Sequence, residues 1–220
     1  MLETFFNLEV LLRAWPLLAE GLWLTLKLGA LSIVLGWLGG LALALLGLYG
    51  PRYLRGVVRL YVDAFRAVPV LVLLIVVYYA LPFVGLSLSA FASAVLALAA
   101  VSSAYTAEIL RAGIEAVPRG QVEAGQVLGL KFWQILRLIV LPQALRLVIP
   151  PLTGNSINVL KDTALASVVA LPDLLKQATQ AQALEANPSP LIAAALIYLV
   201  LLLPLVALVR RLEGRLGKGL

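Results

Sequence analysis

The chain has 220 residues, of which 62% are hydrophobic and only 13% are charged, and its mean hydropathy is +1.02. Soluble domains carry roughly a quarter charged residues, so this composition indicates an integral membrane protein. Cysteine and histidine do not occur in the sequence. Their absence excludes disulfides, thiolate nucleophiles, imidazole bases and the usual zinc ligands, so we expect no catalytic residue, no metal site and no cofactor bound by this chain.

Five apolar segments are long enough to cross a membrane, because a spanning helix needs roughly 20 residues. They lie at residues 22–49, 57–83, 91–110, 147–171 and 191–209. The remaining residues suffice only for short connections. The sequence therefore predicts an all-α fold, a polytopic transmembrane helical bundle of five spans that forms one domain over residues 1–220.

Two amphipathic segments flank or separate these spans. Residues 1–20 precede the first span and are expected to form an interfacial helix. Residues 172–188 lie between the fourth and fifth spans and end at Asn187-Pro188, a sequence that favours a turn. We expect this second segment to form a short helix outside the membrane.

The basic residues predict the orientation of the bundle. Most of the 17 lysines and arginines follow the first, third and fifth spans, and basic residues in short loops tend to stay in the cytoplasm. With an odd number of spans, the amino terminus is then outside and the carboxyl terminus is cytoplasmic. The net charge of +6 follows from this topology and gives no reason to expect a nucleic-acid partner.

The polar segment at residues 118–131 has the pattern of a short helix on the membrane surface. Pro118 and Gly120 interrupt the chain, and the residues that follow suffice for about two helical turns. Gly129 suits a helix end that needs a positive φ angle. An ordinary solvated loop is the alternative interpretation, but the pattern favours a docking element for another protein.

The sequence from Glu123 to Pro142 is similar to the EAA signature of the membrane subunits of bacterial ABC importers. Glu123-Ala124-Gly125, Gly129, Ile139 and Leu141-Pro142 have the spacing of that signature, with Gly125 in place of the usual third alanine. Four further segments resemble the polar amino-acid permeases of the histidine, glutamine and arginine type, namely "DAFRAVPVLV", "SSAYTAEILRAGIEAVPRGQVEA", "LPQALRLVIPP" and "LKDTALASV". The resemblance covers residues 21–182.

This resemblance implies an ABC type I importer-like permease in the bacterial inner membrane. Its implied partners are a cytoplasmic ABC ATPase dimer, which binds the ATP, an extracytoplasmic amino-acid-binding protein, and a second permease copy or a sister permease. The chain has no Walker A sequence, so hydrolysis is expected only in the partner. Residues 118–131 would form the coupling helix, and the coupling residues would be Pro118, Gly120, Gln121, Glu123, Ala124, Gly125 and Gly129.

The fourth expected span carries polar residues at its middle, in the sequence "NSINVLKDT". A charge at bilayer depth costs at least about 2.5 to 3.5 kcal/mol, so such residues usually face a bundle interior or an aqueous path. Pro150 and Pro151 each remove an amide donor, and we expect the helix to be kinked or broken there. The expected substrate pocket is lined by Asn155, Asn158, Asp162, Thr163 and Ser167. In the structural alternative, Lys161 reaches a backbone carbonyl and Asp162 caps a broken helix.

The third expected span carries a second charged site. Glu108 and Arg111 are three residues apart and can meet on one helical face, which favours a structural ion pair. In the alternative, Glu108 contributes to the translocation path, and Tyr105, one turn earlier, flanks the same path. We therefore add Tyr105 and Glu108 to the candidate substrate-binding residues.

One other class of transporter competes with the importer subunit. A self-contained, ion-coupled secondary transporter of a small polar solute could use Asp162 and Glu108 as its coupling carboxylates. That class favours a longer chain or an inverted internal repeat, and no such repeat is visible in the sequence. We therefore expect a permease subunit of an ATP-driven amino-acid importer.

Overall fold

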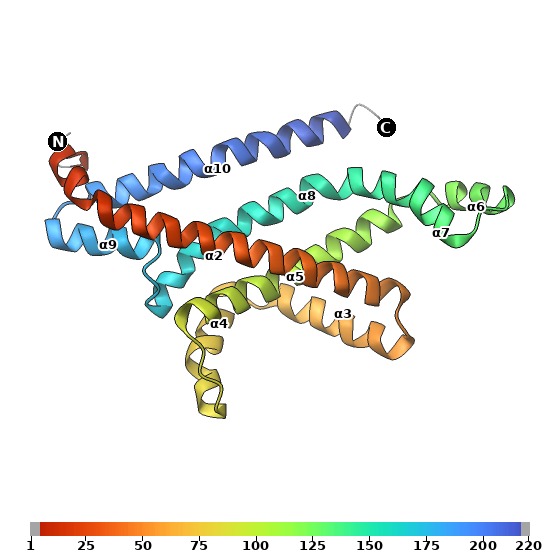
Figure 1. The fold of residues 1–220 in the computed structure, drawn as a ribbon, viewed down its shortest axis with the longest axis horizontal. Coiled ribbons are helices and arrows are strands. Elements are labelled where there is room, and N and C mark those ends of the chain that lie inside the picture. Colours follow the sequence, from red (N-terminus) through yellow and green to blue (C-terminus); the bar gives the residue numbers. More distant parts are fainter. Residues whose placement is uncertain (1–4, 217–220) are drawn as a thin grey trace.

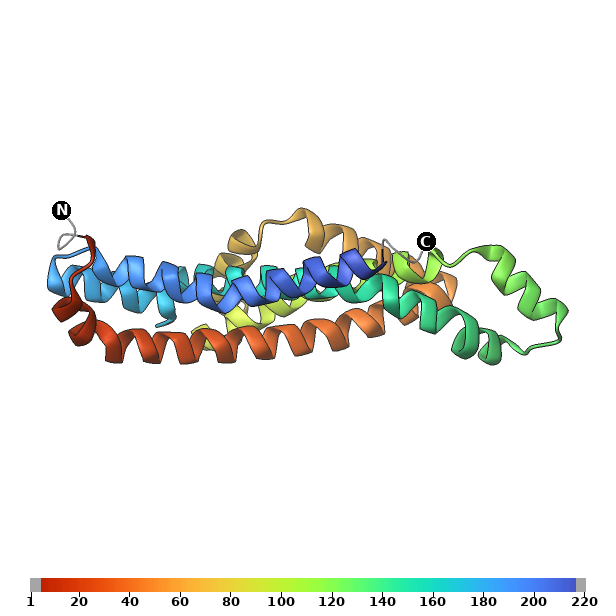
Figure 2. The ribbon, with the colours of Figure 1, turned by 90° about the horizontal axis from the view of Figure 1, so that it is seen from above.

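The computed structural model describes residues 5–216, and these residues form helices joined by short connections, with no strand among them. Four long helices follow the long axis of an elongated bundle (Figure 1): α2 (Leu8–Tyr49), α5 (Ala90–Glu115), α8 (Leu141–Asp162) and α10 (Ser189–Leu216). The view from above shows α6 (Arg119–Val127) at one end of the bundle and the first turns of α2 at the other (Figure 2). The expected all-α bundle is confirmed.

Helix α2 begins earlier than the first expected span. The side chain of Asn7 accepts hydrogen bonds from the backbone N–H groups of Glu9 and Val10, which caps the helix. The following 42 residues form one helix, so the boundary expected at residue 20 is not present. Ala14 and Leu18 are buried against α9 (Leu174–Glu185) and α10. Residues 8–20 are thus continuous in one helix with the first expected span, and their interfacial position stays a prediction.

The second expected span, at residues 57–83, is not one helix. It consists of α3 (Arg52–Ala67) and a second helical piece, Val70–Val84, which begins with α4 (Val70–Ile75), and the two pieces meet at an angle of 103°. Val68 has an extended backbone, because the ring of Pro69 disfavours helical angles at the residue before it. Within residues 5–216, four helices are long and apolar enough to span a membrane, and this bent pair makes a fifth if it counts as one span.

The fourth span also differs from the expectation. A helical segment runs from Phe132 to Val169, and Pro150 and Pro151 lie inside α8 without ending it. Prolines remove hydrogen-bond donors but keep a helical φ angle, and here α8 is held by its packing on α5 and α10. The helix changes character at Thr163 instead, where a 3-10 turn leads to Ala170 with a φ angle of 59°. Of the kink or break expected at the two prolines, the break is therefore wrong.

Small residues bring α2 and α5 close together. A Cβ atom on Gly40 would lie 2.8 Å from the carbonyl oxygen of Ser103, so only glycine fits this crossing. Such close approach through small residues is typical of helices that pack inside membranes. The crossing fixes α5, which carries the candidate site residues Tyr105 and Glu108, against α2, the longest helix of the described chain.

Candidate functional site

Two cavities open between α3, α5 and their neighbours, and we name them for their position and lining. The central cavity has a volume of about 380 Å³ and lies between the loop after α3, α5 and α8. The arginine cavity has a volume of about 550 Å³ and lies between α2, α3 and α5. Along α5 the central cavity comes first and the arginine cavity follows, toward the end of the bundle that carries α6.

Four of the seven candidate substrate-binding residues line the central cavity: Tyr105, Asn155, Asn158 and Asp162. The three residues of α8 are spaced at i, i+3 and i+7, which places them on one helical face. Tyr105 reaches the same space from α5 and is 40% exposed. The sequence therefore located these four residues together, although their binding role stays a prediction.

Thr163 and Ser167 do not line the central cavity. The hydroxyl of Thr163, which is fully buried, donates a hydrogen bond to the carbonyl of Leu160 at 2.6 Å. The hydroxyl of Ser167 donates to the carbonyl of Ala164 at 2.9 Å. Thr163 thus bonds a carbonyl in the last turn of α8 and Ser167 bonds one in the 3-10 turn that follows, which is a local structural role for both.

Asn155 holds α8 to α5. Its Nδ2 atom lies 3.2 Å from Oγ of Ser102 and 3.4 Å from Oγ1 of Thr106, and it can donate to both hydroxyls. These contacts occupy the amide nitrogen, while the residue also lines the central cavity. Asn155 therefore positions the polar face of α8 in addition to lining the space.

Asp162 is a half-buried carboxylate without an ion-pair partner among residues 5–216. The neighbouring Lys161 lines a different, apolar groove between α8 and α10. Asp162 precedes the 3-10 turn, but its side chain makes no capping hydrogen bond. The structural alternative, in which Asp162 caps a broken helix, is therefore not supported, and its carboxylate faces the central cavity.

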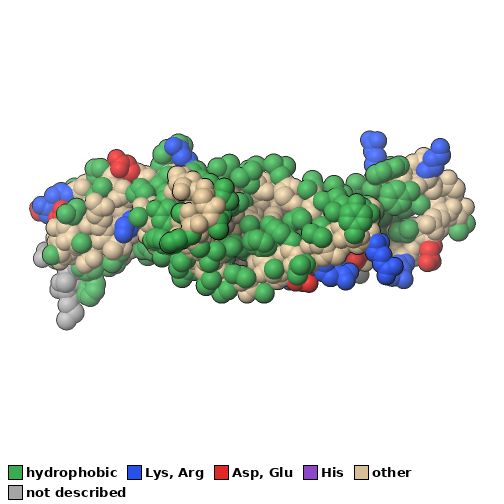
Figure 3. Space-filling view, turned by 90° about the horizontal axis from the view of Figure 1, so that it is seen from below, with side chains coloured by type: hydrophobic (Ala, Val, Ile, Leu, Met, Phe, Trp, Pro, Cys, Tyr) green, Lys and Arg blue, Asp and Glu red, His purple; other side chains and the backbone are tan. Residues whose placement is uncertain are grey.

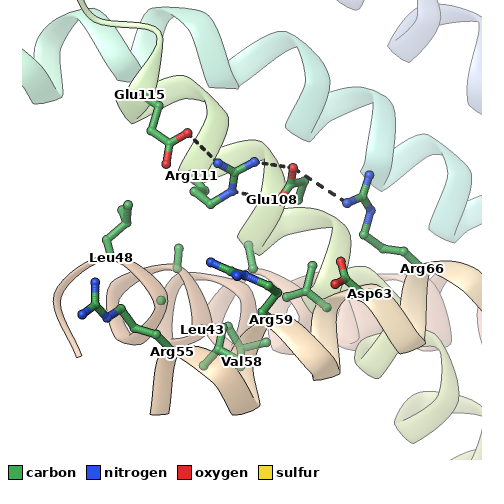
Figure 4. A pocket seen from close by; sticks show the side chains of 14 residues that line it. Leu43, Leu48, Arg55, Val58, Arg59, Asp63, Arg66, Glu108, Arg111 and Glu115 are labelled. Atoms are coloured by element: carbon green, nitrogen blue, oxygen red, sulfur yellow. Dashed lines mark hydrogen bonds and ion pairs between the residues drawn. The ribbon is translucent and has the colours of Figure 1, made fainter. Parts of the chain in front are cut away.

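Glu108 lines the arginine cavity and not the central one. Its two carboxylate oxygens accept hydrogen bonds from Arg111, at 3.0 Å from Nε and 2.7 Å from Nη2, and Arg111 also pairs with Glu115 (Figure 4). The structural ion pair expected between Glu108 and Arg111 is thus present. Glu108 therefore lines a different cavity from the α8 residues, although the sequence assigned all of them to one set of substrate-binding candidates.

Arg66 is a site residue that the sequence did not reveal. It is the only residue that lines both cavities within the described part of the chain. Its guanidinium lies 3.8 Å from Glu108 and 5.5 Å from the centre of the Tyr105 ring. The signal that could have found it is Val68-Pro69, because the break that this pair causes turns the end of α3 toward α5 and α8.

The polar segment expected at residues 118–131 forms the helix α6, with Pro118 at its start and a φ angle of 76° at Gly129. Glu123 and Ala124 are exposed on it, as are Pro118 and Gly120. The expected short helix and the positive φ angle of Gly129 are confirmed. The apolar tip that follows, with Val127 88% and Leu128 78% exposed, was not anticipated.

Two of the seven candidate coupling residues face their own chain. A Cβ atom on Gly125 would lie 2.9 Å from Cδ1 of Ile139, so this glycine, which is buried, allows α6 to pack on the helix that follows it. Gln121 accepts a hydrogen bond from Gln143 at 2.9 Å. Gly125 therefore packs inside its own chain, and the coupling role of both residues stays a prediction.

A bundle of long apolar helices with polar-lined cavities between them and an exposed helical hairpin at one end has the organisation of a transport protein. Residues 32–218 match the family described as binding-protein-dependent transport system inner membrane component, and the chain belongs to this family. Membership favours the importer subunit over the ion-coupled secondary transporter, and this family is not catalytic.

Two curated relatives from Bacillus subtilis (strain 168) show the branch of the family. The L-cystine transport system permease protein TcyB is 37% identical over 93% of this chain and 88% of its own length. The arginine transport system permease protein ArtQ is 36% identical over 91% of this chain and 93% of its own length. The chain therefore resembles these permeases over nearly its full sequence.

Solved structures show the same likeness. The crystal structure of an amino acid ABC transporter with histidines matches with a TM-score of 0.87 and 37% identity, over 93% of this chain and 96% of that chain. An inward-facing conformation of the MetNI methionine ABC transporter matches with a TM-score of 0.70 and 25% identity, over 92% of this chain and 95% of that chain. The fold of the bundle is thus that of an ABC type I importer permease.

Proposed function

We propose that the chain forms the substrate path of an ATP-driven amino-acid importer and that the central cavity binds the amino acid. The observation that carries this proposal is the pairing of opposite charges around one cavity. Asp162 and Arg66 both line it, and neither the carboxylate nor the guanidinium is neutralised by the other within 4 Å. An amino acid offers an ammonium group to Asp162 and a carboxylate to Arg66, and arginine binds carboxylates with two parallel hydrogen bonds.

The size of the cavity suits a small polar ligand. Its volume of about 380 Å³ falls in the roughly 300 to 1,000 Å³ range of small-molecule sites. Tyr105 and Leu98 add apolar surface on one side, which can contact the side chain of the ligand. The names of the relatives, an L-cystine and an arginine permease, support an amino acid as the class of substrate.

We propose further that α6 docks on a cytoplasmic ABC ATPase dimer, which binds and hydrolyses the ATP. Glu123, Ala124 and Gly129 present the exposed side of the hairpin, and the apolar tip at Val127 and Leu128 adds surface that an ATPase groove can bury. Basic residues gather near this end, in agreement with a cytoplasmic face. The space-filling view shows hydrophobic side chains over much of the middle and charged side chains mainly toward the two ends (Figure 3).

The opposite end then faces the outside, with the amino terminus and α9, and receives an extracytoplasmic amino-acid-binding protein. A second copy of this chain or a sister permease completes the path, since each chain carries its own set of cavities. The whole assembly lies in a bacterial inner membrane. Membership of the family supports an ATPase and a binding protein as partners, and the two contrasting ends of the bundle support their placement.

Reconstitution tests this proposal. The chain is co-expressed with a candidate ABC ATPase and a candidate amino-acid-binding protein from the same organism and is placed in lipid vesicles. Uptake of radiolabelled L-arginine, L-glutamine and L-cystine is then measured. ATP is supplied on the side of the vesicle membrane that carries the ATPase, and the binding protein is supplied on the other side. Together they are expected to drive uptake of one of these amino acids. Uptake by the chain alone under a sodium or proton gradient, with no response to ATP, would contradict the proposal.

A further inference from the structure

The two cavities meet at a single side chain. Arg66 lines both of them, whereas the other residues that line the central cavity and those that line the arginine cavity are different. The ring of Tyr105, on the central side, lies 5.5 Å from the guanidinium, and Glu108, on the other side, lies 3.8 Å from it. A molecule that moves from one cavity to the other along α5 must therefore pass Arg66.

The contact between Arg66 and Glu108 is the weak member of a group of charges. At 3.8 Å it is too long for a hydrogen bond, whereas Arg111 binds both oxygens of Glu108 at hydrogen-bond distance. Glu108 therefore stays compensated when Arg66 moves away. Arg66 also lies in the last turn of α3, directly before the 103° bend at Val68-Pro69, so a change of this bend would move its side chain.

Four arginines and three carboxylates line the arginine cavity, and two of the arginines have no acidic partner within residues 5–216. Arg55 and Arg59 line it and form no ion pair among the residues that the structure describes, while Arg111 is already held by Glu108 and Glu115 (Figure 4). Arg59 lies two turns of α3 before Arg66, and Arg55 lies one turn before Arg59. The three arginines therefore extend over roughly 16 Å of the helix. The guanidinium groups thus follow one another on one face toward the α6 end.

We propose that the arginine cavity is the exit compartment of the substrate path, and that Arg66 is the gate that passes the amino acid's carboxylate to Arg59 and then to Arg55. This proposal rests on the function proposed above. In it, the carboxylate replaces the weak contact between Arg66 and Glu108, and the successive arginines keep the anion compensated at each step. Asp63, also in the cavity, offers the ammonium group a partner on the same route.

The first test compares arginines inside and outside the cavity on the same helix. In the reconstituted assembly, Arg55→Gln with Arg59→Gln is expected to lower the maximal uptake rate about tenfold, the effect of losing one charged hydrogen bond. The KM for uptake should stay within about twofold, because the central cavity is unchanged. Arg52→Gln, on the same helix but outside the cavity, is the matched control and should leave both values unchanged.

The second test addresses the gate. Vesicles that contain the assembly are loaded with the transported amino acid, and its loss is followed without ATP. Vesicles with Arg66→Ala are expected to lose the amino acid, whereas vesicles with the wild type or with Arg59→Gln are expected to retain it. Arg66→Lys keeps the charge without the planar group, and it is expected to retain the amino acid but to transport it more slowly.

Three results would overturn the proposal. One is a double glutamine variant that raises KM and leaves the maximal rate intact, which would place the arginines in the initial binding site. Another is an effect that appears only when phosphatidylglycerol is added to phosphatidylcholine vesicles, which would make the cavity a lipid-headgroup site. The third is retention of the amino acid by Arg66→Ala. Failure of the wild type to take up any amino acid with ATP would instead contradict the proposed function itself.

Discussion

The side-chain nitrogen Nε2 of Gln143 donates a hydrogen bond to Oε1 of Gln121 at 2.9 Å, and the same nitrogen contacts the carbonyl of Ile139 at 2.8 Å. This contact ties the first turn of α6 to the start of α8, the helix that carries Asp162. A movement of the hairpin can therefore be transmitted to the polar face of the central cavity through one rigid element.

Removal of this tie is expected to weaken coupling. Gln143→Leu loses a hydrogen bond of about 1 kcal/mol and leaves Gln121 without its partner, so we expect several-fold fewer amino acids carried per ATP hydrolysed. The ratio of uptake to hydrolysis measures this in vesicles. Gln126→Leu, an exposed position on the same hairpin, serves as control, and an equal loss in both variants would argue against transmission through Gln143.

Gly129 and Gly120 should respond differently to alanine. A Cβ atom added to either glycine would have no neighbour within 4 Å, but Gly129 has a φ angle of 76°. Alanine is strained there by about 1 to 2 kcal/mol, so Gly129→Ala is expected to reduce co-purification of the ATPase, while Gly120→Ala is expected to be neutral. Equal co-purification of both variants would show that the positive φ angle does not shape the docking surface.

These glycines illustrate which features of the structure could be predicted from the sequence and which could not. The positive φ angle at Gly129 and the common face of Asn155, Asn158 and Asp162 follow from local spacing, so the sequence predicted both. The contact of Gln121 with Gln143 and the position of Arg66 between two cavities depend on how distant segments pack, which one sequence does not show. Pro69 ends a helix and Pro150 does not, because tertiary packing decides whether a helix continues through a proline.

At the crossing of α2 and α5, the addition of a single methyl group is expected to lower the stability of the protein strongly. Gly40→Ala places a Cβ atom 2.8 Å from the backbone oxygen of Ser103, which cannot rotate away, whereas Gly47→Ala meets only Cγ1 of Val58 at 3.4 Å. Overpacking of this kind costs about 1 to 3 kcal/mol. We expect Gly40→Ala to lower the thermal midpoint in detergent by several degrees and Gly47→Ala to change it little. A neutral Gly40→Ala would mean that the two helices separate easily.

The buried Asp173, outside the spanning helices, predicts a dependence of stability on pH. Burial raises the pKa of this carboxyl to about 6, although its oxygen Oδ1 accepts a hydrogen bond from the backbone N–H of Lys176. Because the folded-state pKa lies above the unfolded value, protonation favours the folded state. The contribution of this group to stability is therefore fully present below about pH 4 and is lost as the pH rises through about 6.

Asp173→Asn tests this sign, since asparagine keeps an oxygen that can cap α9 and carries no charge. We expect the variant to be more stable than the wild type at pH 8, by an amount of the order of 2 kcal/mol, and to match it near pH 4. Thermal unfolding in detergent at pH 4, 6 and 8 measures the difference. A constant offset between the two proteins at all three pH values would rule out titration of Asp173 as the cause.

In the proposed function, Asp162 is the residue on which binding of the amino acid in the central cavity depends most. The most direct measurement is the KM of ATP-driven uptake in reconstituted vesicles for Asp162→Asn beside Lys161→Gln, two adjacent charges of which only Asp162 lines the cavity. We predict that Asp162→Asn raises the KM at least about tenfold, since the ammonium group loses a charged partner, while Lys161→Gln keeps it. An unchanged KM for Asp162→Asn, with both assemblies intact, would contradict a binding role for this carboxylate.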